Sequence, residues 1–247
     1  MSLLGALLIA VVVWTIGLIR SVRWQAFVYS LPIPITLVLA TTSITVTSAQ
    51  LFGVITLNVF FGVVTLAHHY LGWNILLADA LAIGAYVGLS WSFGLLPELG
   101  FWWVLAGVTA LWVLAQLLLA TTAADPERER PGREQLHWAA KFGLVLAGSL
   151  LMSLLGGLLN GFVVTFPYSG VLAAIEVRRD IREFARHFAR NSVCLLGFFA
   201  AFYAVQDTSR LAAFAAGWAG FGLCAGLLHA GERVLTARTP SPGADRP

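Results

Sequence analysis

One acidic side chain lies well inside an apolar segment of this sequence. Asp79 would sit about 7–8 Å from the end of a helix that begins at Asn74, at 1.5 Å per residue. His68 and His69 close the preceding apolar run and could reach it. An ionisable group within a membrane span is costly and is a candidate for function, and imidazole titrates near physiological pH. The three residues suggest a proton-coupling group. The alternative is an acid that is favoured by a helix N-terminus and lies close enough to the headgroups to be hydrated.

Two short stretches, 29–36 and 165–170, place prolines within apolar runs that could cross a membrane. A proline removes a backbone donor and disturbs the preceding helical turn, which lipid tolerates only against protein or a water-filled cavity. Two broken spans in corresponding halves are typical of a transporter's binding site. We therefore predict a substrate site formed by Tyr29, Ser30, Pro32, Pro34, Thr36, Thr165, Pro167, Tyr168 and Ser169. The hydroxyls could instead satisfy the freed backbone groups.

A third group is basic and consists of Arg178, Arg179, Arg182, Arg186 and Arg190. Between these arginines, Ile181, Phe184, Ala185 and Phe188 recur at the spacing of one helix face. The pattern predicts an amphipathic helix on the inner leaflet with its arginines toward anionic lipid headgroups. The alternative is a gate or a funnel for an anionic substrate at the inner mouth.

No sequence motif indicates metal binding, nucleophilic catalysis or nucleotide binding. The five histidines show neither HxxxH nor HExxH spacing, and the two cysteines lie in apolar runs without CxxC spacing. There is no GxSxG sequence, no Walker loop and no pair of carboxylates within the apolar runs. We expect no metal site, no cofactor and no nucleic-acid partner.

The composition is that of a polytopic membrane protein. Of 247 residues, 59% are hydrophobic and 11% are charged, against about 45–50% and about 25% in soluble domains. Nine apolar segments approach the roughly 20 residues that a membrane helix needs. They are Leu3–Ile19, Trp24–Thr41, Gln50–Leu66, Ile75–Phe93, Phe101–Thr121, Trp138–Leu155, Leu158–Ile175, Ser192–Val205 and Leu211–His229.

The basic residues predict the orientation of these nine spans. No Lys or Arg precedes Arg20, which places the N-terminus outside and the C-terminus in the cytoplasm of a bacterial cell. The inner segments 20–23, 122–141, 176–191 and the tail from 230 then hold two, four, five and three basic residues. Fourteen of the fifteen Lys and Arg residues thus fall inside, and only Arg210 falls outside.

The two halves of the sequence look alike. Each has a proline-broken span, a polar connection, a third span and a fourth span with GxxxG spacing, at Gly84–Gly88 and at Gly222–Gly226. GxxxG lets helices approach closely and suggests homo-oligomer contacts through these faces. An odd fifth span would invert the second half relative to the first. We predict a repeat over 1–94, a connecting helix and charged inner loop over 95–137, a second repeat over 138–230 and a disordered tail over 231–247.

A family resemblance accompanies the second half. Phe166-Pro167, the following apolar run, the arginines from Arg178 to Arg190 and the sequence Leu196-Gly197-Phe198-Phe199 resemble the small GlpM-type inner-membrane proteins. The likeness covers roughly 150–205 and more faintly 10–66, where the basic connection is missing. It implies a fused, doubled version of that fold and contributes no catalytic residue.

These features favour a secondary transporter or permease for a small solute or a lipid-linked substrate. A membrane subunit that assembles or anchors a partner is the alternative, because polar residues are few and glycine seams are frequent. A lipid-modifying enzyme is a third hypothesis, for which no nucleophile, base and acid stand together.

Overall fold

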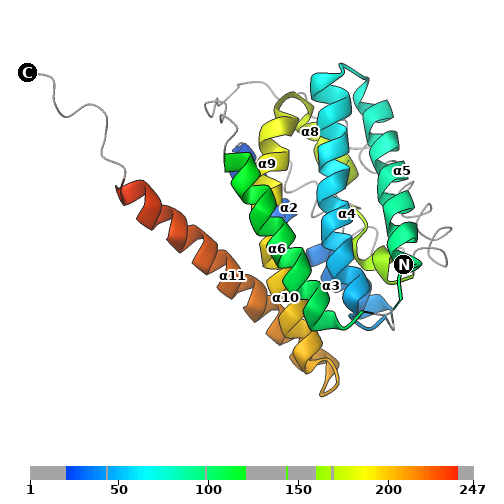
Figure 1. Cartoon of the computed structure of the whole chain (residues 1–247), viewed down its shortest axis with the longest axis vertical. Helices are drawn as coiled ribbons and strands as arrows, with labels where there is room; N and C mark the ends of the chain where they lie inside the picture. The colour runs from blue at the N-terminus through cyan, green and yellow to red at the C-terminus, as the bar shows by residue number, and fades with distance from the viewer. Residues whose placement is uncertain are drawn as a thin grey trace, which may run out of the picture.

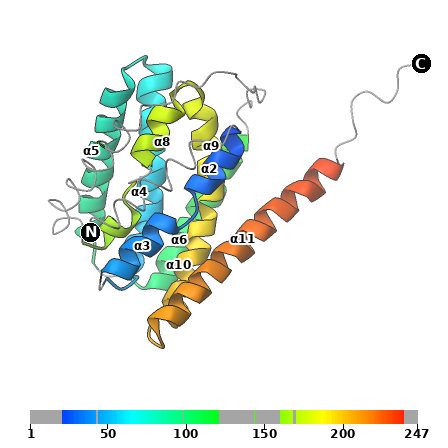
Figure 2. The same cartoon turned by 180° about the vertical axis from the view of Figure 1, so that it is seen from behind.

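A computed structural model describes residues 21–42, 44–97, 99–120, 143, 160–167 and 170–238. Within these ranges the protein is all-helical and forms a bundle from which the last helix diverges (Figures 1 and 2). The elements are α2 (Val22–Tyr29), α3 (Ile33–Thr41), α4 (Ser48–Val64), the π-helix η1 (Thr65–Tyr70), α5 (Ile75–Gly94), α6 (Phe101–Ala120), the 3₁₀-helix η2 (Asn160–Thr165), α8 (Gly170–Glu176), the 3₁₀-helix η3 (Arg178–Asp180), α9 (Ile181–Asn191), α10 (Val193–Val205) and α11 (Arg210–Arg238).

Six helical segments in the described ranges are long and apolar enough to cross a membrane, so the chain is an integral membrane protein by length and composition. They are Val22–Thr41, Ser48–Tyr70, Ile75–Gly94, Phe101–Leu119, Arg178–Val205 and Arg210–Gly231. The predicted spans Leu3–Ile19 and Trp138–Leu155 lie outside the described residues, apart from Gly143. Of Leu158–Ile175, the described part is a 3₁₀-helix and a short α-helix on either side of Pro167.

Local sequence signals set where two of these helices begin. Thr47 caps α4, accepting from the Ala49 N–H at 3.3 Å, while the Gln50 side chain accepts from the Thr47 N–H at 2.6 Å. Asn74 caps α5 by accepting from the Leu76 N–H at 2.9 Å. Gly72 has a φ of 70° between the two helices, a conformation that favours glycine.

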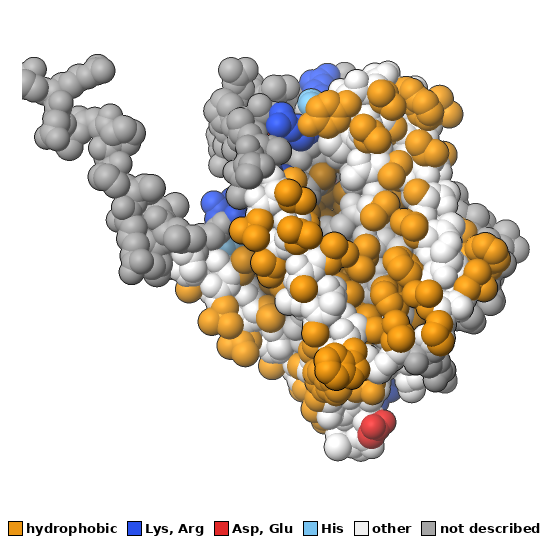
Figure 3. Space-filling model, in the orientation of Figure 1, with side chains coloured by type: hydrophobic (Ala, Val, Ile, Leu, Met, Phe, Trp, Pro, Cys, Tyr) orange, Lys and Arg blue, Asp and Glu red, His pale blue; other side chains and the backbone are white. Residues whose placement is uncertain are grey.

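The bundle has two chemically different ends. At the arginine-rich end, α2 begins, α6 ends and η1 and α9 pack together (Figure 1). In Figure 3 most Lys and Arg side chains in view gather near this end, whereas the flank over α4, α5 and α6 is mostly hydrophobic. At the opposite end, which we call the Gln206 end, Val46 in the connection before α4 meets Gln206 in the turn between α10 and α11.

The predicted surface helix at 179–190 requires a correction. α9 continues through Ser192 into α10, and together they form the candidate span Arg178–Val205. Its apolar face is buried within the protein, because Phe184 and Phe188 pack on Phe61 with ring centroids 5.3 and 4.5 Å apart. The aromatic face therefore packs against protein and is not available to lie in the headgroup region.

The GxxxG glycines do not mediate helix contacts within the described part of the chain, so homo-oligomer contacts through them stay a prediction. Among the described residues, a Cβ on any of Gly84, Gly88, Gly222 or Gly226 would have no neighbouring atom within 4 Å. The close approach lies instead between α10 and α11, where a Cβ on Gly220 would be 2.4 Å from the Gly197 oxygen. Within the chain, the close helix contact therefore lies at glycines outside the two GxxxG sequences.

The C-terminal helix is longer than predicted. α11 continues to Arg238, so residues 231–238 are helical and do not belong to the predicted disordered tail. No proline occurs in that stretch before Pro240, and the residue before a proline is disfavoured in a helix.

Candidate functional site

The first proline break satisfies its backbone groups locally. The Ser30 hydroxyl donates to the Phe27 oxygen at 2.6 Å, and the Thr36 hydroxyl donates to the Pro32 oxygen at 2.6 Å. Both carbonyls also accept a backbone N–H, from Ser30 at 3.0 Å and from Thr36 at 2.8 Å. In this structure the two hydroxyls therefore act on the backbone, which was the alternative to solute binding.

The second break combines a local hydrogen bond, from the Thr165 hydroxyl to the Phe162 oxygen at 3.2 Å, with contacts from residues far away in the sequence. The Tyr86 hydroxyl of α5 donates to the Phe162 oxygen at 2.9 Å and shares a 2.9 Å hydrogen bond with the Thr165 hydroxyl. Thr165 also fits against α4, where a Cβ on Gly53 would lie 1.9 Å from its Oγ1. Tyr168 and Ser169 lie outside the described residues.

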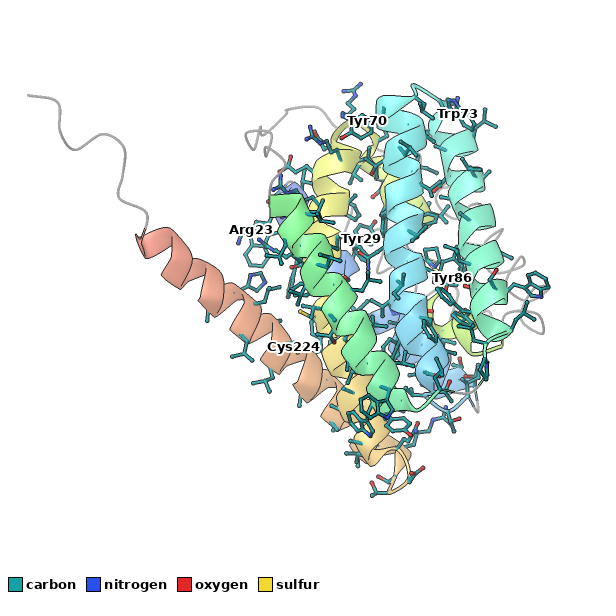
Figure 4. The ribbon with its side chains drawn as sticks, in the orientation of Figure 1. Arg23, Tyr29, Tyr70, Trp73, Tyr86 and Cys224 are labelled. Atoms are coloured by element: carbon teal, nitrogen blue, oxygen red, sulfur yellow. The ribbon has the colours of Figure 1, made fainter. Side chains whose placement is uncertain are left out.

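Both breaks line one cavity. The volume open to the centre of a water-sized sphere is about 30 Å³, which admits water but is small for a solute. Its walls are formed by Tyr29, Ser30, Leu31, Pro34, Ile35, Leu57, Phe61, Thr165, Phe166, Pro167, Gly170, Phe188 and Leu195. Figure 4 shows Tyr29 in the interior of the bundle. The structure thus brings Pro34 and Pro167 together, whereas Pro32 and Thr36 are not among the lining residues.

Few polar groups line this cavity. Its polar side-chain groups are the hydroxyls of Tyr29, Ser30 and Thr165, and no charged side chain is among the lining residues. The remaining surface is aliphatic, aromatic and proline. Such a wall accommodates water or small uncharged groups and gives a full charge no counter-charge.

Asp79 lies apart from this cavity. Its side chain is 3% exposed on the buried face of α5, and neither carboxylate oxygen has a hydrogen-bond partner among the described residues. The Nδ1 atom of His68 is instead 2.8 Å from the Trp73 oxygen, and His69 is exposed. The structure therefore does not pair either histidine with Asp79. A buried carboxyl without a partner is costly, and this keeps Asp79 a candidate for function.

The predicted basic residues differ in their contacts and exposure. Arg178 donates to the Ile175 oxygen at 3.5 Å, and Arg186 donates to the Leu119 oxygen at 3.0 Å, at the end of α6. Arg179 is exposed, while Arg182 and Arg190 are partly buried.

Three important contacts were missed from sequence. Gln206 pairs with the backbone of Val46, accepting from its N–H at 2.9 Å and donating to its oxygen at 3.1 Å. Arg210 donates to the oxygens of Leu39 and Thr42 at the end of α3, where a cation is favoured. Tyr86 is the third. Arg210 had a signal, since it was the single basic residue outside the predicted inner segments.

No protein-family model matches this chain, and no curated protein or solved structure matches it either.

Proposed function

We propose that the protein is a secondary transporter or permease for a small solute or a lipid-linked substrate. The observation that carries the proposal is that residues of both proline breaks line the same cavity. Discontinuous helices that meet within a membrane bundle are the usual site at which transporters bind their substrates. The cavity is too small for most solutes, so transport requires it to widen by movement of the segments around Pro34 and Pro167.

We further propose nine spans arranged as an inverted repeat. In Figures 1 and 2, α2 and α3 run from the arginine-rich end to the Gln206 end, whereas η2 and α8 run back. α4 and the α9–α10 pair likewise run in opposite directions. The packing is reciprocal, since α2 contacts α9 and η2 contacts α4. These opposed directions support two halves related by a pseudo-two-fold axis in the membrane plane.

The proposed orientation places the arginine-rich end in the cytoplasm, following the positive-inside rule. A fluorescent reporter that matures only in the cytoplasm should be bright when fused after Pro247. Activity of a periplasmic reporter at the same position, with a dark cytoplasmic one, would reverse this assignment.

Solvent access to the cavity tests the transporter proposal. In a variant without Cys194 and Cys224, Ser30→Cys should react with a small polar thiol reagent, because Ser30 lines the cavity. Ser90→Cys is the matched control, because Ser90 is equally buried, at 1% exposure, but does not line the cavity. Ser209→Cys, in the exposed turn before α11, gives the rate of full access.

We expect Ser209→Cys to react fastest, Ser30→Cys more slowly and Ser90→Cys least. If Ser30→Cys is as inert as Ser90→Cys from both sides of the membrane, the cavity does not open. The protein would then fit the alternative of an assembly or anchor subunit. The exposed surface of α11 favours that alternative. This helix diverges from the bundle, and its Leu211, Leu223 and Leu227 side chains are 81%, 66% and 66% exposed.

Asp79 is the proposed energy-coupling residue, because a proton-coupled carrier needs a group that binds and releases a proton as access changes. The Asp79→Asn variant keeps size and polarity but removes titration. It should abolish uptake driven by a pH gradient in proteoliposomes while exchange without net proton movement continues. Unchanged coupling in the variant would assign Asp79 to another role.

The same variant makes a prediction that needs no substrate. Because the carboxyl has no hydrogen-bond partner among the described residues, replacing it by an amide should leave the thermal midpoint in detergent unchanged or raise it. A clear fall in the midpoint would mean that Asp79 has a structural partner and is not held at a cost for function.

A further inference from the structure

A fully buried asparagine lies on the cavity-facing side of α9. Asn191 is 1% exposed, and neither its side-chain oxygen nor its side-chain nitrogen has a hydrogen-bond partner among the described residues. The helix continues through Ser192, whose N–H donates to the Phe188 oxygen at 2.9 Å. Asn191 therefore lies one turn from Phe188 and one turn from Leu195 on the same helix face, and both of these residues line the cavity. Asn191 is not itself a lining residue, so it lies directly beside the cavity.

A second asparagine lies at the same level on α4. Phe188 packs on Phe61 with ring centroids 4.5 Å apart, and α4 and the α9–α10 pair run in opposite directions (Figure 1). Asn58 comes three residues before Phe61, and Asn191 and Ser192 come three and four residues after Phe188. Nδ2 of Asn58 donates to Oγ of Ser192 at 3.1 Å, as this register requires. The two asparagines thus lie at the interface of α4 and α9, at the level of the cavity.

These two side chains leave three amide atoms without a hydrogen bond. Asn58 uses Nδ2 on Ser192 and on the Val54 oxygen at 2.8 Å, but its Oδ1 has no partner among the described residues. Asn191 adds an oxygen and a nitrogen. Most buried polar groups in proteins have a partner, and an unsatisfied one costs free energy. The oxygens accept and the nitrogen donates, so the pair presents both kinds of hydrogen-bonding group to one bound molecule.

We propose that Asn58 and Asn191 bind a small uncharged solute that carries both hydrogen-bond donors and acceptors, an amide or a polyol, when the cavity widens. The inference rests on the proposed transport function and names its class of substrate. No charged side chain lines the cavity, so an ion would have no counter-charge there. A neutral polar solute instead exchanges its bonds with water for bonds to two carboxamides. A solute without such groups leaves the carboxamides unpaired and is rejected.

Access to Asn191 tests the position of the site. In the variant without native cysteines, Asn191→Cys should react with the small polar thiol reagent at a rate similar to that of Ser30→Cys, because both face the widened cavity. Gln116→Cys is the matched control. Gln116 also has a buried amide nitrogen without a partner among the described residues, but it lies on α6, from which no residue lines the cavity. It should react no faster than Ser90→Cys.

This experiment separates the inference from the transporter proposal. Inert Asn191→Cys beside reactive Ser30→Cys overturns the inference and leaves the transporter proposal intact. If Ser30→Cys is itself inert, the transporter proposal fails and the inference fails with it.

Solute uptake tests the chemistry of the site. The probes are radiolabelled urea, erythritol and guanidinium, and guanidinium has the planar shape of urea with an added charge. Proteoliposomes of the unaltered protein should take up urea or erythritol faster than protein-free liposomes, and they should not take up guanidinium faster. Uptake of neither neutral probe, or uptake of guanidinium as fast as that of urea, overturns the proposal.

The Asn191→Leu variant keeps a similar volume and removes both amide atoms. Uptake of the transported neutral probe should fall about fivefold or more, the size expected for loss of one hydrogen bond. The thermal midpoint should stay the same or rise, because no hydrogen bond within the described part of the chain is lost. Gln116→Leu is the control and should change uptake less than twofold. If Asn191→Leu does not fold, Asn191→Ala takes its place with the same expected loss of uptake.

The leucine variants also give the results that would contradict this assignment. Unchanged uptake in Asn191→Leu, or an equal loss in Gln116→Leu, overturns the proposal. A loss of uptake together with a lower thermal midpoint in Asn191→Leu also overturns it, because that result indicates a structural role for Asn191.

Discussion

The two proline breaks solve the same problem in different ways. At the first, Ser30 and Thr36 donate to carbonyls three and four residues earlier, and the segment from Val22 to Thr41 still counts as one apolar span. At the second, the Thr165 hydroxyl also donates to the Phe162 oxygen, at 3.2 Å, but the shorter hydrogen bonds, at 2.9 Å, join both groups to Tyr86, more than seventy residues earlier in the chain.

This difference has a consequence for movement. A break that is satisfied by its own residues can tilt or shift without losing its hydrogen bonds. A break that is satisfied by a neighbouring helix keeps its bonds only while it stays against that helix. We therefore expect the first break to be the mobile wall of the cavity and the second to be the fixed wall.

The largest expected effect on stability is at Gly53, the position on α4 against which Thr165 of the second break packs. In Gly53→Ala the new Cβ would lie 1.9 Å from Oγ1 of Thr165, and such overpacking costs about 1–3 kcal/mol in the free energy of unfolding. Gly62→Ala on the same helix meets no atom of the described residues within 4 Å and should gain about 0.5–1 kcal/mol in the free energy of unfolding from helix propensity. Thermal unfolding in detergent measures both. If both variants unfold at the same temperature, Thr165 does not pack tightly against Gly53.

A smaller effect is expected for Tyr86→Phe. The substitution removes the hydroxyl that serves the Phe162 oxygen and Thr165, but the Thr165 hydroxyl still donates to that oxygen, so the cost should be about 0.5–1.5 kcal/mol. Hydrogen exchange should accelerate at 160–167 and stay unchanged at 28–36. Tyr70→Phe, at a tyrosine that is 60% exposed, should change stability by less than about 0.5 kcal/mol. Equal acceleration at the two breaks would contradict the difference drawn between them.

The smallest effects belong to the first break. Ser30→Ala and Thr36→Val each remove one hydroxyl, but the Phe27 and Pro32 oxygens keep a backbone N–H donor. Each variant should therefore cost at most about 1 kcal/mol, measured by the same unfolding experiment. A loss as large as that of Tyr86→Phe would mean that the first break also depends on its side chains.

Sequence reasoning located most of the described helices because apolar run length and proline position are local signals. The starts of α5 and α6 were predicted to the residue, at Ile75 and Phe101. The environment of α9 could not be found in this way, because burial of Phe184 and Phe188 depends on Phe61 from α4. A strongly amphipathic helix looks the same whether its apolar face meets lipid or protein.

Local signals also decided which residues of the candidate site could be named from the sequence. The prolines at both breaks were recognisable because each perturbs its own helix, and the hydroxyls were named because they flank these prolines. Tyr86 was not, since an isolated tyrosine in an apolar run carries no sign of the carbonyl it will bind. The pairing of Asp79 with His68 failed because His68 turns to the Trp73 oxygen in the connection that precedes α5.

The central claim is that the cavity between the breaks opens alternately to the two sides of the membrane. The direct test is the reaction of Ser30→Cys, in the variant without native cysteines, with a membrane-impermeant thiol reagent added to right-side-out and to inside-out vesicles. Alternating access predicts that Ser30→Cys reacts in both preparations, whereas Ser209→Cys reacts in only one of them. Reaction of Ser30→Cys from one side only, or from neither, would contradict alternating access.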